Sequence, residues 1–152
     1  MNKKYISVLF LLFAVITFIG CGKDKELEEY KSNMETFYSD IAVYDLTINS
    51  IDVESDNSVQ DLLTALDNLE ASFTWMASLP VPDEFASIEM FASESSEYMT
   101  NAVALYHQAY ESEPFDITTA QTAKEYYDRA NQRVMYILAI LHGELPDGAA
   151  YN

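Results

Sequence analysis

The chain has a single cysteine, only four glycines, and 8 basic residues against 25 acidic ones in 152 residues. One cysteine, Cys21, allows no intramolecular disulfide and no cysteine-rich zinc site. The scarcity of glycine leaves no glycine-rich loop for a nucleotide phosphate. The formal charge of −17 disfavours nucleic-acid binding by phosphate neutralisation. The fold must therefore be stabilised by packing, and we expect no nucleic-acid partner.

The chain also lacks the motifs of common catalytic and metal centres. Its two histidines are His107 and His142, and the residues three positions before them are Ala104 and Ala139. The Glu-x-x-His motif of di-iron helical bundles is therefore absent. No serine stands in a nucleophile elbow, and no Cys–His pair is available. We therefore expect no enzymatic activity, no cofactor and no metal, and we interpret His107 as a polar residue at the edge of its helix.

No apolar run is long enough to span a membrane. The run from Ile6 to Ile19 is shorter than the roughly 20 residues that a transmembrane helix needs. Two lysines precede it, and a small residue, Gly20, follows it before the sequence becomes polar. A basic start, a short apolar stretch and a small residue at the cleavage point are typical of a secretory signal peptide. The sequence therefore predicts that residues 1–20 are removed.

The segment Phe18-Ile19-Gly20-Cys21 resembles the lipobox of bacterial lipoproteins, with phenylalanine where that family usually has leucine. The resemblance implies that cleavage falls before Cys21, which becomes the first residue and carries lipid, and that residues 21–26 form a short tether. It implies an anchored position on the extracytoplasmic face of the cell membrane, or in the outer membrane of a cell with two membranes. A cleaved, unlipidated secreted protein is the alternative.

Apolar residues recur at alternating spacings of three and four along four later segments, which is the period of packed helices. The segments cover residues 27–51, 58–79, 83–111 and 118–142. Prolines interrupt the second and third connections, and short connections make successive helices antiparallel neighbours. The sequence therefore predicts an all-α, up-down-up-down antiparallel four-helix bundle over residues 27–143, followed by a tail at 144–152.

Two further segments, Val81-Pro82-Asp83-Glu84-Phe85 and Glu97-Tyr98-Met99, resemble small bacterial lipoproteins of unknown function with an all-helical extracytoplasmic domain. This wider resemblance implies an architecture and a cellular address, and no activity.

The two predicted helical hairpins differ in the residues that face each other. Folding the first about residue 55 places Phe37 near Phe73, two large side chains. Folding the second about residue 116 places Ala102 near Ala130, two small ones. Small facing residues let helix backbones approach closely. We therefore expect the second hairpin to be the tighter pair, and we read Thr118 with its glutamine three residues later as the capping box of the fourth helix.

Arg133 is the most unusual charged residue of the fourth helix, because it lies in an otherwise apolar row. It either extends to solvent and forms an ion pair, with Glu125 or with a carboxylate across the bundle, or it binds an anion. In the second case Tyr98, Tyr106 and Tyr126 would line an aromatic groove between the third and fourth helices.

Acidic residues gather in the two loops that close the predicted hairpins, one loop in each hairpin. Asp52, Glu54 and Asp56 alternate in the manner of a calcium loop, but Leu63 replaces the bidentate glutamate and Asn57 replaces the glycine. We expect at most weak cation attraction here. Trp75 lies off the core face of the second helix, where it either packs over the following turn or contacts the membrane interface.

Two functions stay open at this point. The first is a lipid-anchored, non-enzymatic accessory or interaction module with an extracytoplasmic protein partner. The second is a ligand-binding lipoprotein with a small-molecule or anion site near Arg133. A solid core favours the first, and a cavity of several hundred Å³ between helices favours the second.

Overall fold

The computed structural model describes residues 25–144. The predicted signal peptide, Cys21 and the tail from residue 145 onward lie outside the described residues. The described part is all-helical and contains no strand. Its elements are α2 (Lys25–Asn49), α3 (Ser58–Ala77), the 3-10 turn η2 (Asp83–Phe85), α4 (Ser87–Glu111) and α5 (Ile117–Leu141). This confirms the all-α class and the four helices.

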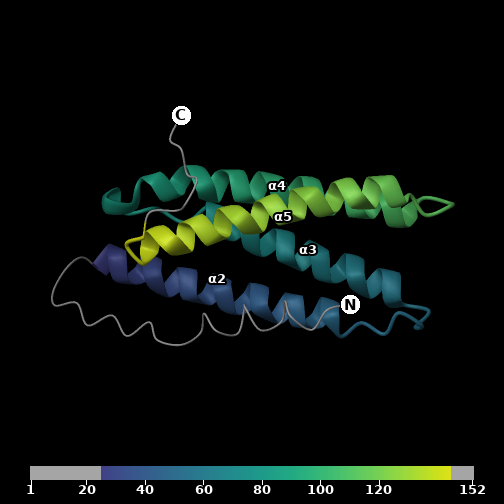
Figure 1. Cartoon of the computed structure of the whole chain (residues 1–152). Coiled ribbons are helices and arrows are strands. Elements are labelled where there is room, and N and C mark those ends of the chain that lie inside the picture. The colour runs from purple at the N-terminus through teal and green to yellow at the C-terminus, as the bar shows by residue number, and fades with distance from the viewer. Residues whose placement is uncertain (1–24, 145–152) are drawn as a thin grey trace.

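The four helices run alternately up and down (Figure 1). The start of α2, the α3–α4 connection and the end of α5 lie at one end of the bundle. The loops at residues 50–57 and 112–116, called the distal loops below, lie at the other end. Three helices begin within two residues of the predicted positions, whereas α4 begins at Ser87 and not at 83, because Pro82 holds an extended backbone and residues 83–85 form a 3-10 turn.

The α2–α3 hairpin is packed through large side chains, as the sequence predicts. Phe37 and Phe73 are both completely buried. Their ring centroids lie 5.3 Å apart with an interplanar angle of 80°, the edge-to-face geometry that aromatic pairs favour. The predicted meeting of these two residues is confirmed.

The α4–α5 hairpin is packed through small side chains, and its two helices share more close backbone contact than any other helix pair among residues 25–144. Ala102 and Ala130 are completely buried, as predicted. Their predicted pairing is wrong, because the Ser95 hydroxyl donates to the Ala130 carbonyl at 2.9 Å. Ala102 lies seven residues from Ser95, or roughly 10 Å along the helix. The hairpin is tight in a register one heptad from the predicted one.

The predicted capping box of the fourth helix is also wrong. The N-cap is Asp116, whose Oδ1 accepts from the backbone N–H groups of Thr118 and Thr119 at 3.0 and 3.1 Å. These bonds, the one from Thr119 first, lower the pKa of the Asp116 carboxyl. Thr118 thus lies inside the first turn, where its N–H is a donor to the cap.

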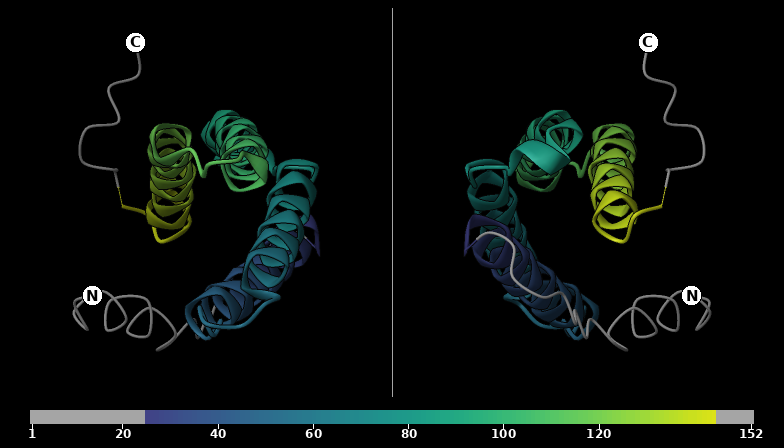
Figure 2. Two further views of the ribbon diagram at one scale, coloured as in Figure 1. Left: turned by 90° about the vertical axis from the view of Figure 1, so that its right-hand side faces the viewer. Right: turned by 90° about the vertical axis from the view of Figure 1, so that its left-hand side faces the viewer.

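The helices follow an arc, with α2 and α5 at its two ends, as the end-on views show (Figure 2). Long polar side chains connect these two helices. The Tyr127 hydroxyl donates to Asp45 Oδ1 at 2.9 Å, and burial raises the pKa of the Asp45 carboxyl. Nearby on α2, the buried hydroxyls of Tyr30 and Tyr38 have no hydrogen-bond partner within the described residues. The contact between α2 and α5 is called the α2–α5 seam below. Its buried polar groups are therefore less completely hydrogen-bonded than those in the rest of the interior.

The cavity in this seam is small. It has a volume of about 20 Å³, enough for about one water molecule, and Met34, Tyr38 and Leu138 are among its lining residues. None of the helices within residues 25–144 combines the length and apolarity needed to cross a lipid bilayer.

Candidate functional site

Arg133 lies on the outer side of the α4–α5 hairpin and is held by partners from both helices. Its Nε donates to Glu94 Oε2 in a short ion pair. Its guanidinium carbon lies 6.0 Å from the ring centroid of Phe91, 5.8 Å from that of Tyr98 and 5.6 Å from that of Tyr136. The side chains of Arg133 and Glu94 are 24% and 36% exposed. The cation is thus neutralised and covered, and an anionic ligand would have to displace Glu94.

The three tyrosines predicted beside Arg133 are only partly brought together. Tyr98 contacts Arg133, and its ring lies 6.1 Å from that of Tyr126. Tyr126 in turn stacks with Arg129, at 5.5 Å. Tyr106 does not join this cluster: its ring lies 6.4 Å from that of Tyr110. Burial, the largest cause, raises the pKa of Tyr106 to about 12.

Sequence reasoning missed three of the residues that contact Arg133, namely Glu94, Phe91 and Tyr136. A signal was present in the residue numbers. In an antiparallel helical hairpin, the numbers of two residues that face each other add up to a constant. The Ser95–Ala130 contact fixes that sum near 225, and 94 with 133 then falls within reach. The sequence alone favours a different sum, because the prediction placed Ala102 opposite Ala130.

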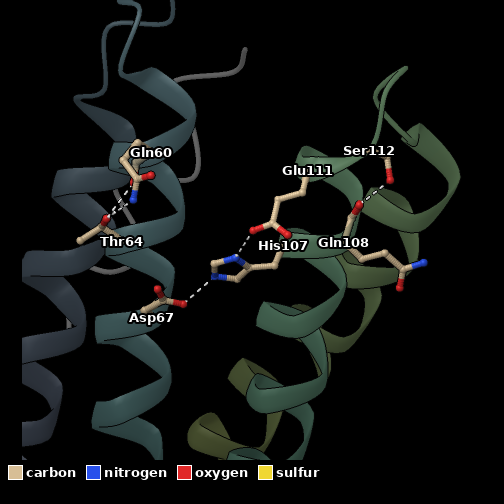
Figure 3. A network of polar contacts seen from close by, with 7 residues as sticks. All are labelled: Gln60, Thr64, Asp67, His107, Gln108, Glu111 and Ser112. Atoms are coloured by element: carbon tan, nitrogen blue, oxygen red, sulfur yellow. Dashed lines mark hydrogen bonds and ion pairs between the residues drawn. The ribbon is translucent and has the colours of Figure 1, made fainter.

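His107 connects α4 to α3 through Asp67, and it also contacts Glu111 on its own helix (Figure 3). Its Nε2 lies 2.7 Å from Asp67 Oδ1, and its Nδ1 lies 3.1 Å from Glu111 Oε1. A neutral imidazole has one N–H, so donation to both carboxylates requires the imidazolium. The hydrogen bonds, the one to Asp67 first, raise the pKa of His107. The sequence predicts its place at the helix edge but not this pairing, because Asp67 lies 40 residues away.

The acidic residues of the first distal loop do not form a metal centre. Among residues 25–144 there is no group of three or more His, Cys, Asp or Glu side chains arranged to hold a metal ion. The Oδ1 of Asp52 accepts from the backbone N–H of Glu54 at 3.1 Å, and both side chains, like that of Asp56, are exposed. Leu63 is buried in the core, so this position contributes packing where a calcium loop has a ligand.

A shallow, open stretch of surface lies along the exposed face of α3. It is lined by Asp67, Glu70, Ala71, Thr74, Trp75 and Ser78. Trp75 is 37% exposed. Trp75 lies in this stretch near the end of α3, and its packing over the following turn or its contact with a membrane interface stays a prediction.

Large apolar side chains are exposed at nine positions of the described chain. Six of them lie in or beside the distal loops: Val43, Leu46, Val53, Val59, Phe115 and Ile117. The other three are Trp75, Met90 and Met135. The apolar surface is therefore concentrated at the end of the bundle opposite the start of α2.

Comparison of the chain with protein-family models, with curated proteins and with solved structures finds no match.

Proposed function

We propose that this chain is a lipid-anchored, non-enzymatic accessory or interaction module on the extracytoplasmic face of a bacterial membrane. The anchor rests on the sequence Phe18-Ile19-Gly20-Cys21 after a short apolar run. The interaction role rests on one observation, the contrast between the interior and the surface. The cavity between α2 and α5 holds about one water molecule, whereas apolar side chains are exposed around the distal loops.

The alternative, an anion site near Arg133, is less well supported. Glu94 already supplies the negative charge, and three aromatic rings cover the guanidinium. The open surface along α3 carries the carboxylates of Asp67 and Glu70, which repel anions. An anion site at Arg133 would therefore need Glu94 to move away.

The anchor and the bundle together imply an orientation. The tether precedes α2, so the start of α2 faces the membrane and the distal loops point away from it. A helix of 25 residues is roughly 37 Å long, so the loops extend about that far from the lipid surface. Apolar side chains at that distance are placed to meet another protein rather than the bilayer.

Site-selective photo-cross-linking tests this function. A photoreactive amino acid is placed at Val53 or Phe115, both exposed in distal loops, and at Gln132, exposed on α5, as the control. In intact cells of the native host, we expect a discrete cross-linked band from the distal positions and none from Gln132. Equal patterns from all three positions would contradict an interaction surface at the distal end.

A further inference from the structure

We infer that the loop at residues 112–116 is the contact surface of the interaction module, with Phe115 as its central side chain. Its partner is a protein that presents an apolar recess bordered by lysine or arginine. This inference rests on the proposed function, because it names which distal loop binds and the chemistry of what it binds. The loop joins α4 to α5 and extends past the ends of both helices, at the end of the bundle opposite the start of α2 (Figure 1).

Phe115 stands at the outer end of a row of aromatic rings. Its ring centroid lies 5.0 Å from that of Tyr110, whose own centroid lies 6.4 Å from that of Tyr106. Tyr106 and Tyr110 are partly buried and pack against the hydrophobic core. Phe115 itself is 47% exposed. The ring of Phe115 is therefore supported from the core while much of it stays accessible to a partner.

The backbone on both sides of Phe115 is held by hydrogen bonds. The Ser112 hydroxyl donates to the Gln108 carbonyl at 2.6 Å. The Asp116 N–H donates to the Ala109 carbonyl at 3.2 Å, and the Asp116 carboxylate caps α5. These bonds oppose a rotation of the ring into the core. They also reduce the conformational entropy that the loop would lose when a partner binds.

The local role of this position does not account for an exposed ring. A residue before an N-cap often packs against the fourth residue of the helix, which here is Ala120, a side chain too small to cover a phenylalanine ring. Ile117, two residues after Phe115, is 63% exposed as well. Aromatic residues are enriched at protein interfaces, and the other distal loop, residues 50–57, contains none. The 112–116 loop is therefore the one that offers a fixed aromatic contact.

The charge of the loop determines the sign of the charge on its partner. Residues 111–117 carry three carboxylates and no lysine or arginine. Glu111 contacts His107, and Asp116 caps α5. Glu113 is exposed and makes no ion pair or hydrogen bond with another residue of the described chain. A basic border on the partner would meet these carboxylates, whereas a second copy of this chain would bring the same negative charges and be repelled.

Photo-cross-linking with paired variants tests the loop and the chemistry of its partner. A photoreactive amino acid replaces Ile117 in the full-length protein, in intact cells of the native host. We expect a discrete cross-linked band that falls at least about fivefold with Phe115→Ala, because the central contact is lost. Glu113→Lys should cause a similar fall, because it places like charges against each other.

The matched controls lie in the other distal loop, at residues 50–57. Val53→Ala and Glu54→Lys make the same kinds of change at exposed positions and should leave the band as in the parent. Melting temperatures show whether each variant stays folded. Glu113→Lys changes no packed side chain, so it decides the matter if Phe115→Ala lowers the melting temperature. Mass spectrometry of the cross-linked band should identify a partner peptide with lysine or arginine beside apolar residues.

Three results would overturn the inference. The first is a band that persists with Phe115→Ala and Glu113→Lys, and the second is an equal fall with Val53→Ala and Glu54→Lys. The third is a cross-linked peptide that is acidic or comes from a second copy of this chain. The proposed function fails separately. A band from a photoreactive group at residue 53 that is unchanged by Phe115→Ala would leave an interaction at the distal end and remove the role of this loop, whereas no band from either distal loop would remove both.

Discussion

The α2–α3 and α4–α5 hairpins both join two long antiparallel helices, yet they are stabilised by different kinds of side chain. In the first, Phe37 and Phe73 meet edge to face in the core. In the second, alanines and Ser95 let the backbones approach closely. The first depends on burying large apolar area, and the second depends on leaving no room between helices. The two hairpins should therefore respond in opposite ways to a change of side-chain size.

The largest effect is expected from Phe73→Ala. It removes a fully buried ring and leaves a cavity against Phe37, which should lower the free energy of unfolding by about 3–5 kcal/mol. Urea unfolding followed by circular dichroism measures this loss. Trp75→Phe on the same helix, at a partly exposed position, is the control and should cost far less.

The reverse change should damage the other hairpin. Ala102→Leu and Ala130→Leu each insert a large side chain into a completely buried position, and each should cost about 1–3 kcal/mol by overpacking. The control is Ala104→Leu, exposed on the same helix as Ala102. If the melting temperatures of both buried variants equal that of the parent, α4 and α5 do not pack on these residues.

A smaller effect is expected on the outer side of the α4–α5 hairpin. Arg133→Ala removes the ion pair with Glu94 and the contacts with three rings, and should cost roughly 1 kcal/mol, since the group is partly exposed. Glu94→Gln should cost no more. If thermal unfolding shows that the free energy of unfolding falls by several kcal/mol, the hairpin depends on Arg133 for its stability.

The smallest effect concerns the junction between the hairpins, at His107. Its folded-state pKa is raised, so its stabilising contribution is complete at pH values below the unfolded pKa near 6.5 and is lost as pH rises through the higher folded pKa. Because the partners are exposed, the change should stay below about 1 kcal/mol. His107→Gln should flatten this part of the stability profile, as pH-dependent thermal unfolding would measure.

Much of the fold is predictable from the sequence because its determinants are local. The three-and-four spacing sets the helices, and the Phe37–Phe73 meeting follows from a short loop. The register of the second hairpin was predicted wrongly for a physical reason. Small residues recur every seven positions on both helices, as at 95 and 102 on α4, so two registers bring small residues together. The hydrogen bond from the Ser95 hydroxyl to the Ala130 carbonyl marks the register that forms.

The candidate contacts were predictable only in part. The contact of Arg133 with Tyr98 and the edge position of His107 follow from helical spacing, whereas the rings of Phe91 and Tyr136 beside Arg133 were missed. Their partners Glu94 and Asp67 lie 39 and 40 residues away, and no local pattern specifies such pairs.

The arc of helices has a mechanical consequence. α2 packs mainly against α3, and it is the helix that follows the proposed lipid anchor. A partner that holds the 112–116 loop while the proposed anchor stays in the membrane would apply force along the bundle axis. That force enters at the start of α2, so α2 and α3 are loaded in shear along their whole contact, and the interlocked rings of Phe37 and Phe73 must slide past each other before the hairpin yields. Large interdigitated side chains resist such sliding, so the contact of Phe37 with Phe73 would carry this load in the helix pair that follows the proposed anchor.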